Sequence, residues 1–150
     1  MLIIFLTIIF FSADFFLKKI IEQKFSFNTS YPLIKNVVSL RIVHNTGAAF
    51  GILRGETLFL VFLGIIFLAI FLFWVFRQKY TASGKVFLSM ILGGALCNLY
   101  DRIFLGYVID YIDLGWWPVF NLSDSFITVG CSFFIVSYLC ENAGKKKTGI

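Results

Sequence analysis

Residues 93–124 read GGALCNLYDRIFLGYVIDYIDLGWWPVFNLSD, and this stretch decides how the rest of the chain is interpreted. It begins inside one apolar run and ends at the start of another. Between them it carries Asp101, Asp110, Asp113 and Asp124, which are four of the eight acidic residues in the chain. Ionisable groups inside or at the edge of a membrane are energetically costly, so they usually serve a function. The stretch is therefore predicted to hold a functional site at a membrane boundary.

The composition indicates an integral membrane protein. The chain has 150 residues, of which 59% are hydrophobic and 14% charged, and 20 are Phe. Soluble domains carry about a quarter charged residues. The net charge of +5 comes without a basic patch interleaved with exposed aromatic residues, so no nucleic-acid partner is expected. A chain of this length predicts a single membrane-embedded domain covering residues 1–150.

Four apolar runs predict four transmembrane helices, at about residues 2–21, 57–76, 86–105 and 124–140. A run of about 20 residues matches the ~30 Å hydrocarbon core of a bilayer. A cleaved signal peptide is the alternative interpretation of the first run, but this run lacks a basic leading segment and a small-residue cleavage site. The sequence therefore predicts a mainly α-helical membrane protein.

The polar segments between these runs differ from one another. Residues 22–56 contain the β-favouring run Val37–Val43, followed by the turn signal Asn45-Thr46-Gly47, and predict a small β-rich cradle outside the membrane. Residues 106–123 are expected to form a polar loop, and residues 141–150 a basic tail.

Basic residues predict the orientation. Arg77, Lys79 and Lys85 lie in the turn between the second and third helices, and three consecutive lysines, 145–147, lie in the tail. Lys and Arg concentrate on the cytoplasmic side of membrane proteins. Both termini are therefore expected in the cytoplasm, with the loops 22–56 and 106–123 outside.

In such a bundle the polar residues converge at one depth. Four antiparallel helices bring the ends of the first and third to the same side as the starts of the second and fourth. Asn98 and Arg102 are spaced i, i+4 and share one helix face. The residues expected near the outer boundary are Asp14, Lys18, Asn45, Asn98, Asp101, Arg102, Asn121 and Asp124.

Asp110 and Asp124 are candidates for acid–base chemistry. Two carboxylates brought together at a low-dielectric boundary cannot both ionise easily, so they share a proton. That state suits peptide hydrolysis with neither metal nor cofactor. The spacing alone leaves alternatives open, because Asp124 is also well placed as a helix N-cap. The spacing does not exclude Asp113, three residues after Asp110.

The other polar residues also have structural interpretations. Asp14 and Lys18, spaced i, i+4, predict an intrahelical ion pair with Lys18 extended outward to the interface, the alternative being contact with substrate. The asparagines fit caps and turns as well as amides that hold a substrate backbone. Three cysteines in apolar runs argue against a disulfide framework or a zinc site.

Two other functions compete with proteolysis. A proton or ion transporter also places Asp, Lys and Arg inside the membrane. It would need polar residues along a path through the bundle, whereas here they gather at one depth. A non-enzymatic membrane subunit would leave the dense carboxylate strip without a role.

Four motifs in order resemble the bacterial lipoprotein signal peptidases (signal peptidase II). They read NTGAAFG at residues 45–51, GGALCNLYDR at 93–102, VIDY at 108–111 and FNLSD at 120–124. A fifth element, Asp14-x-x-x-Lys18, lies in the first helix. The resemblance covers the whole chain, including the four spans and the long first outer loop.

The resemblance implies an aspartyl protease of the bacterial cytoplasmic membrane, with its active site facing outward. Such enzymes cut the signal peptide from prolipoproteins just before a cysteine that carries diacylglycerol. The family's catalytic aspartates correspond to Asp110 and Asp124, which makes Asp113 a bystander. The partners implied are lipid-modified prolipoproteins, membrane lipids and globomycin-type inhibitors.

The resemblance also assigns the surrounding residues. Asn45, Asn98, Arg102 and Asn121 match substrate-binding positions, and the supporting positions are Asp14, Lys18, Gly47 and Asp101.

Four residues depart from the usual family pattern. Cys97 replaces Gly, Tyr111 replaces Phe, Ser123 replaces Ala, and Phe15 replaces Gln. The first three are expected to leave the carboxylates untouched.

Overall fold

A computed structural model describes residues 1–48 and 51–147, with side chains up to Cys140. Ala49 and Phe50, which belong to the motif at 45–51, and the last three residues of the predicted tail lie outside the described residues. The elements in chain order are α1 (Leu2–Lys24), β1 (Ser30–Ile34), β2 (Val38–Asn45), α2 (Thr57–Arg77), α3 (Ala82–Phe104), β3 (Val108–Asp113) and α4 (Leu122–Lys147). The prediction of a mainly helical protein with a small β-rich segment is confirmed.

Three helices in the described part of the chain are long and apolar enough to cross a membrane. They are α2, α3 and the part of α4 between Leu122 and Cys140. Most side chains of α2 are exposed, including Phe62 and Phe73, so this helix presents an apolar surface suited to lipid. α1 is equally long but carries several ionisable side chains.

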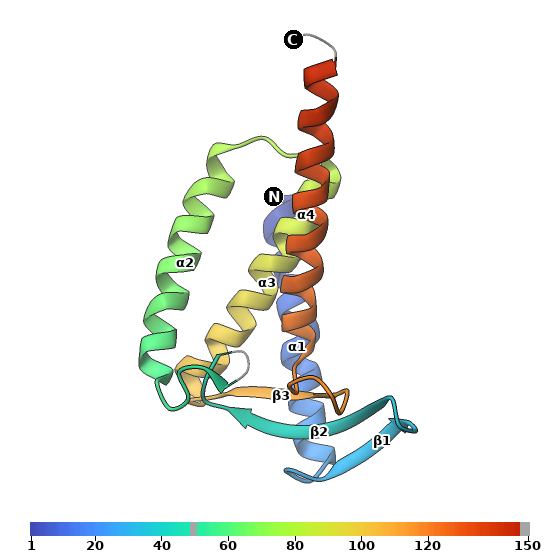
Figure 1. Cartoon of the computed structure of the whole chain (residues 1–150). Coiled ribbons are helices and arrows are strands. Elements are labelled where there is room, and N and C mark those ends of the chain that lie inside the picture. Colours follow the sequence, from blue (N-terminus) through green and yellow to red (C-terminus); the bar gives the residue numbers. More distant parts are fainter. Residues whose placement is uncertain (49–50, 148–150) are drawn as a thin grey trace.

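Close backbone contacts hold α3 between α1 and α4. A Cβ atom at Gly93 would lie 2.7 Å from Cβ of Phe10, and one at Gly94 would lie 2.5 Å from the carbonyl oxygen of Ser123. Glycines allow membrane helices to approach this closely. α2 packs on α3 and leans away from α1 and α4 (Figure 1).

The strands form one antiparallel sheet in the order β1-β2-β3. The presence of β3 corrects the expectation that residues 106–123 form only a loop. Its first four residues are buried on both faces, so its sequence lacks the polar–apolar alternation that marks a half-exposed strand. β3 pairs with β2 so that Asp110 lies opposite Val43, and Val108 lies opposite Asn45.

The sheet closes one end of the helical bundle. Ile109 and Tyr111 of β3 pack with Leu40, Ile42 and the α1 residue Ile21 in a buried cluster. Because side chains alternate along a strand, Asp110 points to the opposite face. Figure 1 shows the sheet at the end where α1 finishes and α4 begins. The fold therefore brings β3, the end of α3 and the start of α4 together.

The start of α3 also differs from the expected position. The helix begins at Ala82 rather than near residue 86, because the Thr81 hydroxyl accepts a hydrogen bond of 3.2 Å from the Gly84 N–H. A threonine N-cap satisfies one of the unpaired donors of the first turn.

The contact at Gly94 predicts that Gly94→Ala destabilises the bundle by about 1–3 kcal/mol, because the added methyl group meets the rigid backbone of α4. Gly64→Ala is the matched control. Among the described residues its methyl group would meet the Leu99 side chain at 3.2 Å, and alanine favours the helix by about 1 kcal/mol. Thermal unfolding in detergent measures both variants. Equal unfolding temperatures would contradict the close-packing argument.

Candidate active site

Asp110 and Asp124 reach the same cavity from different elements. Asp110 lies on β3, and Asp124 lies in the first turn of α4. Both line a cavity of about 520 Å³, together with Asn45, Asn98 and Arg102. Val43 and Ile127 give other parts of the cavity wall an apolar character, as expected for a ligand pocket.

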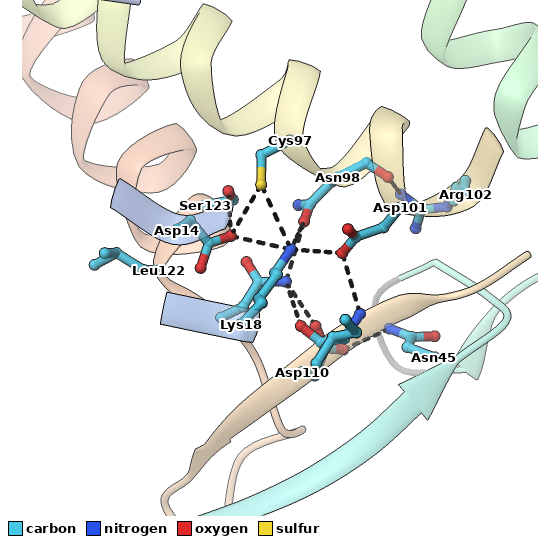
Figure 2. Close-up of polar contacts among 12 residues, drawn as sticks. Asp14, Lys18, Asn45, Cys97, Asn98, Asp101, Arg102, Asp110, Leu122 and Ser123 are labelled. Carbon is cyan, nitrogen blue, oxygen red and sulfur yellow. Dashed lines mark hydrogen bonds and ion pairs between the residues drawn. The ribbon is translucent and has the colours of Figure 1, made fainter. Parts of the chain in front are cut away.

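Asp110 is buried and held by two side-chain amides. Asn45 Nδ2 donates to Oδ2 at 2.9 Å, and Asn121 Nδ2 donates to Oδ1 at 2.8 Å. Figure 2 shows Asn45 and Asp110 meeting from neighbouring strands. Burial, followed by the nearby charge of Asp124, raises the pKa of Asp110 to about 7. These neutral donors orient the carboxylate but do not cancel its charge.

Asp124 is held by the start of its own helix and by α3. Asn98 Nδ2 donates to its Oδ1 at 2.8 Å, and the Asn121 N–H donates to its Oδ2 at 3.3 Å. In return, the Asp124 N–H donates to Asn121 Oδ1 at 2.9 Å. This reciprocal pair is a capping box in which Asn121 is the N-cap. The interpretation of Asp124 as the N-cap is therefore wrong.

Lys18 determines the orientation of the Asn98 amide. Lys18 Nζ donates to Asn98 Oδ1 at 3.1 Å. Because an ammonium group can only donate, the amide oxygen of Asn98 must face Lys18, and its NH₂ group is free to face Asp124. The neutral amide of Asn98 therefore lies between the ammonium group of Lys18 and the carboxylate of Asp124.

Lys18 lies inside the bundle, which makes the prediction of an outward-extended Lys18 wrong. Its side chain is 2% exposed, and Nζ lies 3.0 Å from Asp14 Oδ2 and 2.7 Å from Asp101 Oδ2 (Figure 2). The i, i+4 pair with Asp14 exists as expected. The second carboxylate, from α3, keeps the ammonium group buried.

Asp101, Arg102 and Gly47 connect the site to its surroundings. Asp101 Oδ2 accepts the Ile109 N–H at 3.3 Å, which ties α3 to the strand that carries Asp110. Arg102 Nη2 donates to the carbonyl oxygen of Gly47 at 2.9 Å. The Gly47 N–H in turn donates to Asn45 Oδ1 at 2.9 Å, which fixes the amide that binds Asp110.

Asp113 is engaged elsewhere. Its Oδ2 lies 2.9 Å from Arg41 Nε, and its Oδ1 accepts the Gly115 N–H at 2.8 Å. The pair between Asp113 and Arg41 joins β3 to β2 at the far end of the strand.

Asp14 has hydroxyl partners that the sequence analysis missed. Tyr111 Oη donates to Asp14 Oδ1 at 2.8 Å, and Ser123 Oγ donates to Oδ2. Cys97 Sγ lies 3.5 Å from the same Oδ2. These three side chains contact the carboxylate of Asp14, whereas the hydrogen bonds described for Asp110 and Asp124 come from asparagines. The sequence signal that could have indicated these contacts is position: Tyr111 directly follows Asp110, and Ser123 directly precedes Asp124.

Comparison with known proteins identifies the family. The family model described as "Signal peptidase (SPase) II" matches residues 6–140, which include every candidate site residue. The chain belongs to the signal peptidase II family.

Relatives and a solved structure agree with this assignment. The lipoprotein signal peptidase of Halothermothrix orenii is 41% identical over 82% of this chain and 85% of its own length. That of Desulfitobacterium hafniense is 40% identical over 98% of this chain and 99% of its own. A solved structure of a bacterial membrane enzyme aligns with a TM-score of 0.88 at 29% identity, over 95% of this chain and 90% of the other. The chain is thus a membrane protein of a peptidase family.

The buried ammonium group predicts a large effect of Lys18→Met. Removing it leaves Asp14 and Asp101 as buried carboxylates without their shared cation, which costs about 3–5 kcal/mol of stability. Lys19→Met is the control, because Lys19 is exposed and contacts only the ring of Phe15 among the aromatic residues described. Thermal unfolding in detergent should show a large loss for the first variant alone. A similar stability for both variants would contradict the role of Lys18.

Proposed function

We propose that this protein is an intramembrane aspartic endopeptidase. In this proposal it removes signal peptides from diacylglyceryl-modified prolipoproteins, cutting just before the lipidated cysteine. One observation carries the proposal: Asp110 and Asp124 line one cavity, and each carboxylate is oriented by asparagine side chains. The similarity to lipoprotein signal peptidases supports the substrate class.

The proposed reaction uses the two carboxylates as one unit. A pair that shares one proton can act as base and acid in the same step, and it titrates as a pair. The ionised carboxylate takes a proton from water while the water oxygen bonds to the scissile carbonyl carbon. The protonated carboxylate donates to the carbonyl oxygen. As the tetrahedral intermediate collapses, the C–N bond breaks and a proton passes to the leaving amine.

The asparagines support this role through their geometry. Each of the four carboxylate oxygens of Asp110 and Asp124 accepts one hydrogen bond, so each keeps a lone pair for water or substrate. Asn121 is central, because its Nδ2 donates to Asp110 while its own N–H donates to Asp124. Neutral donors hold the dyad without fixing both carboxylates as ions.

Arg102 is the proposed contact for the substrate backbone. Its Nε is buried and has no hydrogen-bond partner within residues 1–48 and 51–140, although Arg102 lines the cavity. A guanidinium group carries five N–H donors, so Arg102 can keep its bond to Gly47 and also donate to a substrate carbonyl group. Asn45 and Asn98 lie beside it along the cavity wall.

The proposed membrane arrangement has four spans, at about residues 2–21, 57–76, 86–105 and 124–140. α1 fits as the fourth span because Asp14 and Lys18 are buried and paired, while apolar residues such as Phe5 and Ile8 are exposed. The basic turn 77–85 supports cytoplasmic termini and an outward-facing sheet. The membrane would be the bacterial cytoplasmic membrane.

Lipid recognition belongs to the same proposal. The cavity wall is apolar at Val43, Val108 and Ile127, so the substrate's acyl chains would enter from the bilayer beside the dyad. Membrane lipids and globomycin-type inhibitors would compete for this space.

The dyad proposal predicts that Asp110→Asn and Asp124→Asn each lower kcat by about 10²–10⁴-fold, because proton transfer to and from water is lost. The measurement is cleavage of a diacylglyceryl-modified prolipoprotein by the detergent-purified protein. Asp113→Asn makes the same change on the same strand, outside the hydrogen bonds of the dyad, and should cleave at close to the wild-type rate.

Two outcomes would contradict the proposal. Cleavage at the wild-type rate by either dyad variant would exclude the assigned chemistry. Cleavage of the unlipidated precursor as fast as the lipidated one would exclude lipid recognition.

The raised pKa of Asp110 predicts the pH dependence. The pKa of about 7 means that the pair keeps a shared proton below this pH and loses it above. kcat should therefore fall as the pH rises through about 7, because two ionised carboxylates leave no acid to polarise the carbonyl group. Initial rates between pH 5 and 9 test this. A constant rate across the range would contradict the shared proton.

A further inference from the structure

The hydroxyl group of Tyr111 joins three elements behind the cavity. It donates to Asp14 Oδ1 on α1 at 2.8 Å and accepts the N–H of Leu122, the first residue of α4, at 3.0 Å. Tyr111 itself belongs to β3 and is 4% exposed. The first N–H groups of a helix lack partners within the helix, so this hydroxyl satisfies one of them.

The same carboxylate also holds the start of α4 through Ser123, whose Oγ donates to Asp14 Oδ2. Tyr111 immediately follows Asp110, and Ser123 immediately precedes Asp124. Asp14 therefore holds the sequence neighbours of both dyad carboxylates. Figure 2 shows Asp14, Leu122 and Ser123 gathered at the start of α4.

This link bears on the relative position of the two carboxylates. A loop connects β3 to α4. It comes back to β3 at Phe120, whose N–H donates to the Ile112 carbonyl oxygen at 3.1 Å. Beyond Phe120, the hydroxyl group of Tyr111 links β3 directly to Leu122, the first residue of α4, by accepting its N–H. Catalytic groups work only within a narrow range of separations, and small displacements cost large factors in rate.

We propose that Tyr111 is a positioning residue for the dyad, with Ser123 as its partner on Asp14. The hydroxyl of Tyr111 holds β3, and with it Asp110, at a set distance from the start of α4, which carries Asp124. This inference rests on the proposed function. It assigns to Tyr111 no contact with substrate.

Tyr111→Phe isolates the hydroxyl group. The ring packs in the buried cluster with Ile21, Leu40, Ile42 and Ile109, and phenylalanine preserves that packing. The variant loses one hydrogen bond to a carboxylate and one to the α4 backbone. β3 and α4 can then move apart, which weakens the repulsion between the two dyad carboxylates.

The test compares wild type, Tyr111→Phe, Ser123→Ala and Tyr107→Phe in detergent with the lipidated prolipoprotein. Tyr111→Phe should lower kcat about tenfold and change KM less than twofold. The decline of kcat at high pH should also move to lower pH, because a more separated pair holds its shared proton less tightly. Ser123→Ala should also lower kcat and move its decline to lower pH, by a smaller factor in each case. This variant tests the proposal if Tyr111→Phe fails to fold. Tyr107→Phe removes a hydroxyl from a ring stacked on His44 and should behave as wild type.

Three results would overturn the proposal. Unchanged kcat in both Tyr111→Phe and Ser123→Ala would exclude positioning. A loss of kcat with an unchanged pH profile would show a general structural role instead. A change in KM alone would indicate substrate contact. Failure of the wild type to cleave the lipidated substrate would instead refute the proposed function, so the two failures are distinguishable.

Discussion

The buried ammonium group of Lys18 is the interaction on which the polar half of the structure depends. Its ammonium group contacts three oxygen acceptors, from Asp14 on its own helix and from Asp101 and Asn98 on α3. Inside a membrane bundle no water is at hand to replace a lost partner. These contacts of Lys18 form together at one register of α1 against α3. Gly93 permits this register, because its missing side chain lets α3 meet the backbone of α1. Packing and charge pairing therefore select the same arrangement.

Lys18 lies one residue away from the proposed dyad. Lys18 contacts Asn98, and Asn98 contacts Asp124, so a neutral amide stands between the ammonium group and the carboxylate. A cation in direct contact with either carboxylate would favour its ionised form and weaken the sharing of a proton. Asparagine provides strong orientation without added charge. This explains why the residues that bind Asp110 and Asp124 are amides, and why the ion pairs lie behind them.

Some features could be predicted from sequence because they follow from hydropathy and chain order. The helices follow from long apolar runs, and the gathering of polar groups follows from the alternating direction of successive helices. The direction of Lys18 could not be predicted, because the i, i+4 spacing places it beside Asp14 but does not reveal Asp101 on another helix. β3 was missed because it is buried on both faces. The N-cap of α4 was misassigned because Asn121 and Asp124 are equally good caps, and only the reciprocal hydrogen bonds distinguish them.

The substitutions at Cys97, Tyr111 and Ser123 show a limit of reading positions one at a time. Each is a small change, and each lies next to a proposed site residue without altering it. In the fold all three meet at Asp14, two as hydroxyl donors and one through sulfur. The same carboxylate also pairs with Lys18, whose Nζ lies 3.0 Å from Oδ2. The effect of each substitution therefore depends on the others. Their shared partner lies about a hundred residues away in the chain, so only the three-dimensional structure reveals the connection.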